Sequence, residues 1–202
     1  MPTKMQSNIH FYVNWAKERL DEMEAVLTSL EGTAGTVQAE ARDKANKALA
    51  DLRKSRDIFR DTVKKQAEAN EAAWTSAKAK LEPEWNSFEA EVKKYVESFG
   101  KQLEQQKATF KLQSAAQLKA WREAADKLGS DTKQFAAGRQ AEIDAAVKRM
   151  QADAAAAEEK LQKHLDQVGA QSWSALMAAL TETRGAFDRA NQAARDAFKR
   201  AA

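Results

Sequence analysis

Large apolar residues return every eleven positions along residues 85–202. The series is Phe88, Phe99, Phe110, Trp121, Thr132, Ile143, Ala154, Leu165, Leu176, Phe187 and Phe198, in which only Thr132 and Ala154 are not large and apolar. Eleven residues complete three helical turns at about 3.67 residues per turn, close to the natural 3.6, so the series forms a nearly straight stripe on an α-helix. The pattern therefore predicts long amphipathic helices and gives no support for strands.

Two neighbouring columns widen this stripe. One contains Trp74, Trp85, Val96, Leu118 and Trp173, and the other contains Leu81, Val92, Leu103, Ala125, Val147 and Leu180. Together they cover an arc of about 100°, the width of one buried face of an amphipathic helix. We define the aromatic stripe as Trp74, Trp85, Phe88, Phe99, Phe110, Trp121, Trp173, Phe187 and Phe198. These side chains are expected either to bind a surface or to pack against other helices.

Glycine and proline divide the chain into two regions. Residues 1–35 are predicted to form an N-terminal helix, over 5–31, and a turn at Gly32 and Gly35. Residues 36–202 are predicted to form a long repeat-helical region. The fold class is all-α, with the long helices either extended or folded back as an antiparallel helical bundle or coiled coil.

The repeat-helical region contains one internal proline, Pro83, within a strong apolar pattern. Proline lacks a backbone donor and clashes one turn back, which predicts a kink or a restart with Pro83 in the first turn of a helix. After it, residues 84–128 are expected to form one helix of about 65 Å.

Two further turns are predicted near residues 129 and 169. Gly129 suits a helix C-terminus, and Ser130 or Asp131 suits the cap of the next helix. That helix is expected to continue through Val168, with a turn or a simple continuation at Gly169.

The net charge of +3 is unevenly distributed. Residues 1–40 hold 3 basic and 6 acidic residues (−3), and residues 41–80 hold 11 basic and 6 acidic residues (+5). We define the basic patch as Arg42, Lys44, Lys47, Arg53, Lys54, Arg56, Arg60, Lys64 and Lys65. It suits anionic lipid headgroups, while nucleic acid is disfavoured; interleaved aspartates also allow an ordinary solvated face.

Catalytic and metal-binding patterns are missing from the sequence. There is no cysteine, and the residues three positions before His10 and His164 are Ser7 and Leu161, so the Glu-x-x-His pair of a di-metal bundle is absent. Glycine-rich phosphate loops and nucleophile elbows are also absent. Glutamates and aspartates are expected on the solvent side of the helices. The sequence predicts a protein that is not an enzyme, with no catalytic residues, cofactor or metal site.

The eleven-residue repeat with its aromatic anchors resembles the exchangeable apolipoproteins, and the cysteine-free, alanine-rich composition resembles that of bacterial phasins. The resemblance implies helices that adsorb to a lipid or hydrophobic granule surface, with a helical bundle as the detached state. The alternative is a structural coiled-coil rod or bundle that self-associates or scaffolds partners. No signal peptide or apolar run long enough for a transmembrane segment is visible, which predicts a cytoplasmic protein, at times peripheral to a lipid or granule surface.

Overall fold

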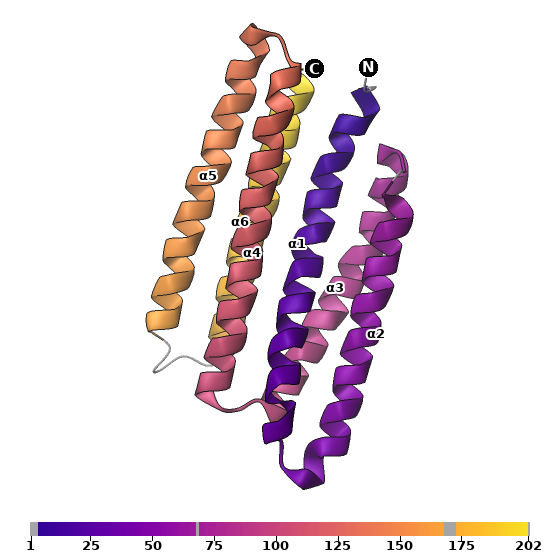
Figure 1. Ribbon diagram of the computed structural model, residues 1–202, viewed down its shortest axis with the longest axis vertical. Helices are drawn as coiled ribbons and strands as arrows, with labels where there is room; N and C mark the ends of the chain where they lie inside the picture. The colour runs from indigo at the N-terminus through magenta and orange to yellow at the C-terminus, as the bar shows by residue number, and fades with distance from the viewer. Residues whose placement is uncertain (1–3, 68, 168–172, 202) are drawn as a thin grey trace.

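Six long α-helices pack antiparallel into a bundle in the computed structural model, which describes residues 4–67, 69–167 and 173–201 (Figure 1). The helices are α1 (Lys4–Thr33), α2 (Arg42–Gln66), α3 (Glu71–Phe99), α4 (Leu103–Asp131), α5 (Ala137–Asp166) and α6 (Trp173–Ala201). Short 3₁₀ helices, η1 (Ala34–Thr36), η2 (Ala39–Ala41) and η3 (Thr132–Gln134), occupy two of the turns. The all-α prediction is confirmed, and the chain is folded back instead of extended.

The helices form two groups of three. α1, α2 and α3 all contact one another, as do α4, α5 and α6, and Figure 1 shows the two groups side by side. We call them the N-terminal half and the C-terminal half. Between them, α1 packs extensively on α4 and also on α6; we call this contact the central interface.

The first helix occurs as predicted and ends at Thr33, and η1 follows directly; the turn includes Gly35, but Gly32 lies inside α1. The single helix predicted over 84–128 is wrong: α3 ends at Phe99, and α4 begins at Leu103. Gly100 is the residue that permits this reversal. A Cβ built on it would lie 3.3 Å from Val96 Cα, closer than most side chains tolerate. The apolar repeat stays in phase across this turn, which is why the sequence pattern alone suggests one continuous helix.

The restart predicted at Pro83 is also wrong, since α3 runs through it from Glu71 to Phe99. α3 begins at Glu71, directly after its N-cap Asn70, whose side chain accepts a hydrogen bond from the Ala73 amide at 2.9 Å. Pro83 lies on the exposed side of α3, between Leu81 and Trp85 on the buried side. The carbonyl that loses its donor there faces the solvent side of the helix, where the loss costs least.

The turn predicted near 129 occurs a few residues later than expected. Gly129 and Asp131 lie inside α4, and the N-cap of α5 is Ala136, which makes no side-chain cap bond; the capping roles predicted for Ser130 and Asp131 are therefore wrong. Thr132 terminates α4 instead, donating its hydroxyl to the Leu128 carbonyl at 2.9 Å. The predicted residues Val168 and Gly169 lie outside the described residues, between the end of α5 and the start of α6.

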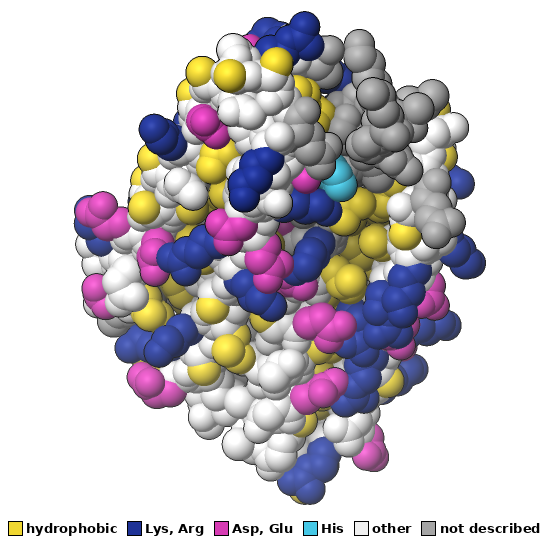
Figure 2. All heavy atoms as spheres, turned by 45° about the horizontal axis from the view of Figure 1, so that its top comes forward, with side chains coloured by type: hydrophobic (Ala, Val, Ile, Leu, Met, Phe, Trp, Pro, Cys, Tyr) yellow, Lys and Arg dark blue, Asp and Glu magenta, His cyan; other side chains and the backbone are white. Residues whose placement is uncertain are grey.

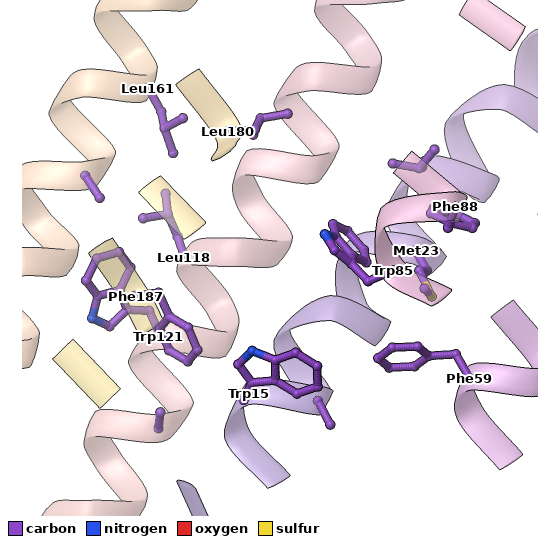
Figure 3. Close-up of a cluster of buried hydrophobic side chains, with 14 of the residues drawn as sticks. Trp15, Met23, Phe59, Trp85, Phe88, Leu118, Trp121, Leu161, Leu180 and Phe187 are labelled. Carbon is purple, nitrogen blue, oxygen red and sulfur yellow. The ribbon is translucent and has the colours of Figure 1, made fainter. Parts of the chain in front are cut away.

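The buried apolar side chains form one cluster that spans both halves. In the N-terminal half Met23, Phe59 and Phe88 converge from α1, α2 and α3, and in the C-terminal half Trp121 and Phe187 pack edge to face with ring centroids 5.6 Å apart (Figure 3). Burial of such side chains contributes about 1.5–3 kcal/mol each, which is the main term that stabilises the bundle.

Two neighbouring positions on α4 test this description of the core. Phe110 is 1% exposed, whereas Leu112 is 42% exposed. Phe110→Ala should lower the free energy of unfolding by about 3–5 kcal/mol, because it leaves a cavity, and Leu112→Ala should change it by no more than about 0.5 kcal/mol. Urea denaturation followed by circular dichroism measures both; equal losses would contradict the packing described here.

Candidate functional site

The aromatic stripe lies inside the bundle. Eight of its members are buried, and Phe99 is half-buried against the same core. The stripe residues of α3 face α1 and α2, while Trp121 and Phe187 meet between α4 and α6. In the closed bundle these side chains therefore pack against other helices of the same chain, and a surface could reach them only after the helices separate.

Buried polar side chains gather at the central interface. Among the described residues, those with less than a tenth of their surface exposed are Glu18, Arg19, Glu22, Ser29, Thr109, Gln113, Ser114, Gln117, Thr132, Thr183, Arg184 and Asn191. All except Thr132 belong to α1, α4 or α6. Within the described part of the chain, α2, α3 and α5 bury only apolar side chains. The two halves thus meet through a partly polar layer, and each half is held together mainly by apolar packing.

Arg184 of α6 and Glu22 of α1 form the centre of this layer. Glu22 is fully buried and Arg184 is 4% exposed. The guanidinium donates from Nε to Glu22 Oε2 at 2.7 Å and from its terminal nitrogen to Glu22 Oε1 at 2.9 Å. A two-pronged bond of this kind fixes orientation as well as distance, so it sets the position of α6 along α1.

Two glutamines of α4 complete the coordination of Glu22. Gln113 and Gln117 each donate an amide hydrogen to Glu22 Oε1 at 3.0 Å. Gln117 also donates to the Leu180 carbonyl at 2.9 Å and accepts a hydrogen bond from the Thr183 hydroxyl. These bonds tie α1, α4 and α6 into one network whose geometry leaves little freedom to slide.

The second arginine of the layer, Arg19, lies beside this centre. It donates two bonds of 2.6 Å to Asp188 of α6 and one of 2.9 Å to Glu18, and its guanidinium lies 4.6 Å from the centroid of the Trp15 ring. The aromatic face partly replaces water around this buried cation.

Arg184 also connects the network to α3. It donates to Glu89 at 2.9 Å and lies 4.5 Å from the centroid of the Trp85 ring. At the start of α3, Glu71 pairs with Arg195 and Lys199 of α6. We call the α3–α6 ion pairs made by Glu89 and Glu71 the clasp.

The two buried glutamates have opposite pKa shifts. Burial and the neighbouring Glu22 carboxylate raise the pKa of Glu18 well above its ordinary value of 4.5. Burial also opposes ionisation of Glu22, but Arg184 and the hydrogen bonds that the carboxylate accepts lower its pKa to about 2. Burial disfavours the charge on Arg184, yet Glu22 and Glu89 raise its pKa above the ordinary value. At neutral pH, Glu22 and Arg184 are charged, while burial and the Glu22 carboxylate favour the protonated form of Glu18.

The expectation that acidic side chains lie on the solvent side is wrong for Glu18 and Glu22. They follow Trp15 by three and seven residues, which are helical spacings, so they lie on the buried face of α1. Arg184 likewise lies between Leu180 and Phe187 at spacings of four and three. Charged residues at apolar positions on two helices were the pattern in the sequence that could have revealed this site.

The basic patch lies on α2, and most of it is exposed. Figure 2 shows Lys and Arg side chains gathered at its right edge, on the side where α2 lies in Figure 1, with acidic side chains among them. Arg53 pairs with Glu31, and Arg56 pairs with Glu24, so these arginines fasten α2 to α1. Among the described residues, no carboxylate lies within ion-pair distance of Lys44, Lys47, Lys54, Lys64 or Lys65.

A groove of about 630 Å³ runs between α3 and α6, with α1 as its floor. Tyr12 and Trp15 contribute aromatic rings, but Arg195 lies 4.9 Å from the centroid of the first and Lys78 lies 5.1 Å from that of the second. The protein's own cations therefore cover the aromatic floor that a ligand would use.

Comparison with known proteins finds no matching family model, no matching curated protein and no matching solved structure. The described residues contain no cluster of three or more metal-binding side chains. None of the helices, over the part of the chain that the structure describes, is long and apolar enough to cross a membrane.

Replacing Glu22 tests the centre of the polar layer. Glu22→Gln should lower the free energy of unfolding at pH 7 by about 3 kcal/mol, because Arg184 remains buried without its main counter-charge. The matched control is Glu123→Gln, which removes a 44% exposed carboxylate paired with Lys17 and should cost less than about 1 kcal/mol. Similar losses in the two variants would show that the buried pair stabilises the fold no more than an exposed pair does.

The lowered pKa of Glu22 predicts how the stabilities of the wild type and Glu22→Gln depend on pH. A lowered pKa stabilises the folded protein above the ordinary value of 4.5, and this contribution is lost as the pH falls from 4.5 towards 2. Over that interval the wild type should lose stability more steeply than Glu22→Gln in urea titrations.

Proposed function

We propose that this protein attaches to anionic lipid or storage-granule surfaces through the hairpin of α2 and α3, and that the six-helix bundle is its detached state. The observation that supports this proposal is the outer face of α2. Ile58 is 48% exposed there, and Lys44, Lys47, Lys54 and Lys65 lie within about 40° of it around the helix. Unpaired lysines around an exposed apolar side chain suit the interface between lipid headgroups and acyl chains.

The inner faces of the same hairpin would supply the apolar contact. α3 buries Trp74, Leu81, Trp85 and Phe88, and α2 buries Leu52 and Phe59 among others. The described residues of these two helices bury no charged side chain, whereas α1 and α6 bury Glu22 and Arg184 on the corresponding faces. Charged groups at an apolar surface are costly, so α2 and α3 are the pair best suited to it.

The hairpin is also a part of the bundle that could separate as a unit. α2 and α3 make their extensive contacts with each other and with α1. The turns at 34–41 and 100–102 join them to the remaining helices. The clasp between α3 and α6 would have to break on release, and part of it, such as the pair of Lys199 with Glu71, is solvent-exposed. Such exposed pairs contribute little stability.

A second candidate is a structural or scaffolding bundle with no affinity for surfaces. One observation favours it: the aromatic stripe is already packed within a single chain, so no surface is needed to cover it. The two candidates differ in whether the protein binds vesicles.

Flotation with lipid vesicles distinguishes them. The wild type should bind vesicles with anionic lipid and bind neutral ones far less. Lys47→Glu/Lys54→Glu/Lys65→Glu should weaken binding about a hundredfold, because each basic residue near the surface is worth about 1 kcal/mol. The control places the same charge change elsewhere, as Lys111→Glu/Lys119→Glu/Lys148→Glu on α4 and α5, and should reduce binding much less. Absence of flotation for the wild type would reject surface attachment and favour the scaffold.

Cross-linking tests whether the hairpin must open. Because the chain has no cysteine, Glu24→Cys/Arg56→Cys can be joined by a short bis-maleimide, which would hold α2 on α1. Quenching of tryptophan fluorescence by brominated lipid chains should then disappear, and flotation should weaken to what the outer face of α2 alone provides. The control joins α4 to α5 through Arg122→Cys/Glu158→Cys and should leave quenching intact. Trp74 and Trp85 are already buried in the closed bundle, so their emission wavelength would change little on transfer to lipid. Quenching therefore reports insertion better than emission wavelength does.

A further inference from the structure

Glu18 is a buried acid that the packing leaves incompletely paired. Its side chain has no exposed surface. Oε2 accepts a bond from Arg19 at 2.9 Å, and when the carboxyl is ionised Oε1 has no hydrogen-bond partner among the described residues. The neighbouring carboxyl of Glu22 is within hydrogen-bonding reach, so a protonated Glu18 can donate to it.

The charged groups around Glu18 do not balance. α1 contributes Glu18, Arg19 and Glu22, α6 contributes Arg184 and Asp188, and α3 contributes Glu89. From α4 only the neutral side chains of Gln113 and Gln117 enter the described network, and on α2 Arg56 pairs with Glu24, which lies on another face of α1. Four carboxyl groups thus share two guanidiniums, giving −2 when all are ionised and −1 with one proton bound.

Of the four carboxyl groups, Glu18 has the fewest interactions that would stabilise a negative charge. Glu22 has a two-pronged arginine and two glutamine donors, and Glu89 and Asp188 are partly exposed to water. Glu18 accepts a single bond, from Arg19, and is not exposed to solvent. Like charges in a buried site cannot all ionise, so the proton stays on Glu18.

We propose that Glu18 is a proton-binding site that couples closure of the central interface to pH: the closed interface holds one proton on Glu18, and opening releases it. This proposal rests on the buried cluster and is independent of the surface-binding proposal. When α1 separates from α4 and α6, water reaches the carboxyl and removes the reason for its neutrality.

The direction of the effect follows from the raised pKa. A group whose pKa is raised in the closed state contributes its full stabilisation below its ordinary value of 4.5 and loses it as the pH rises through the closed-state pKa. Between those limits the equilibrium for opening should increase up to about tenfold per pH unit for one proton. Glu18→Gln, which has the shape of the protonated acid, should remove this dependence.

Thiol labelling measures the opening directly. Ser29→Cys places a thiol at the central interface, where the Ser29 hydroxyl lies 2.7 Å from that of Thr109 and its residue is 7% exposed. Its rate of labelling by a disulfide reagent is divided by the rate for the same cysteine in a short unfolded peptide of the same sequence. This ratio should rise several-fold between pH 5 and pH 8.5. In the Glu18→Gln background this ratio should stay constant, and in Glu123→Gln it should rise as in the wild type.

A second thiol locates the opening. Ala154→Cys lies on α5 within the C-terminal half and is 3% exposed at that position, so it should be labelled more slowly than the interface thiol at every pH. The proposal is overturned if the corrected rate at Ser29→Cys does not change with pH, if the change survives in Glu18→Gln, or if the two thiols are labelled equally fast. Urea titrations of the wild type and Glu18→Gln give a further check, because their difference in stability should grow in favour of the variant as the pH rises.

Discussion

The pairing of Arg184 with Glu22 is the constraint on which the arrangement of the two halves depends. Apolar packing alone would let α6 shift along α1 by a turn at modest cost, because the many alanines of α6 offer similar surfaces at several registers. The buried Arg184 guanidinium must meet both Glu89 and the Glu22 carboxylate, which two glutamines of α4 hold in place, so it has a single acceptable position. Buried charges of this kind add little net stability but penalise every register that leaves them unpaired.

The lengths of the helices follow from the eleven-residue repeat. α3, α4, α5 and α6 begin at Glu71, Leu103, Ala137 and Trp173, which are 32, 34 and 36 residues apart. Each spacing is close to three repeats, so a helix and its turn together occupy about 33 residues. The turns therefore recur without disturbing the phase of the stripe, and all four helices present equivalent apolar faces to one core.

This regularity also explains what could be predicted from the sequence. Periodicity reports which side of a helix is buried, so the all-α class, the N-terminal helix and the apolar stripe were recognisable. Periodicity does not report whether a helix continues. The reversal at Gly100 and the start of α3 after Asn70 were therefore missed, and a helix restart was wrongly predicted at Pro83. The polar layer was missed for another reason: Glu18, Glu22 and Arg184 occupy apolar positions, and only the packing of α1 against α6 shows that these residues meet.

The bundle thus combines two apolar halves with the polar layer at the central interface, and its surface carries the basic outer face of α2.

The most direct test is a double-mutant cycle at Arg184 and Glu22, using Glu22→Gln, Arg184→Met and the double variant in urea unfolding at pH 7. We expect a coupling energy of about 3 kcal/mol or more, because each single change leaves the other charge buried and poorly paired. A coupling energy below about 1 kcal/mol, as found for exposed pairs, would contradict the central role assigned to this contact.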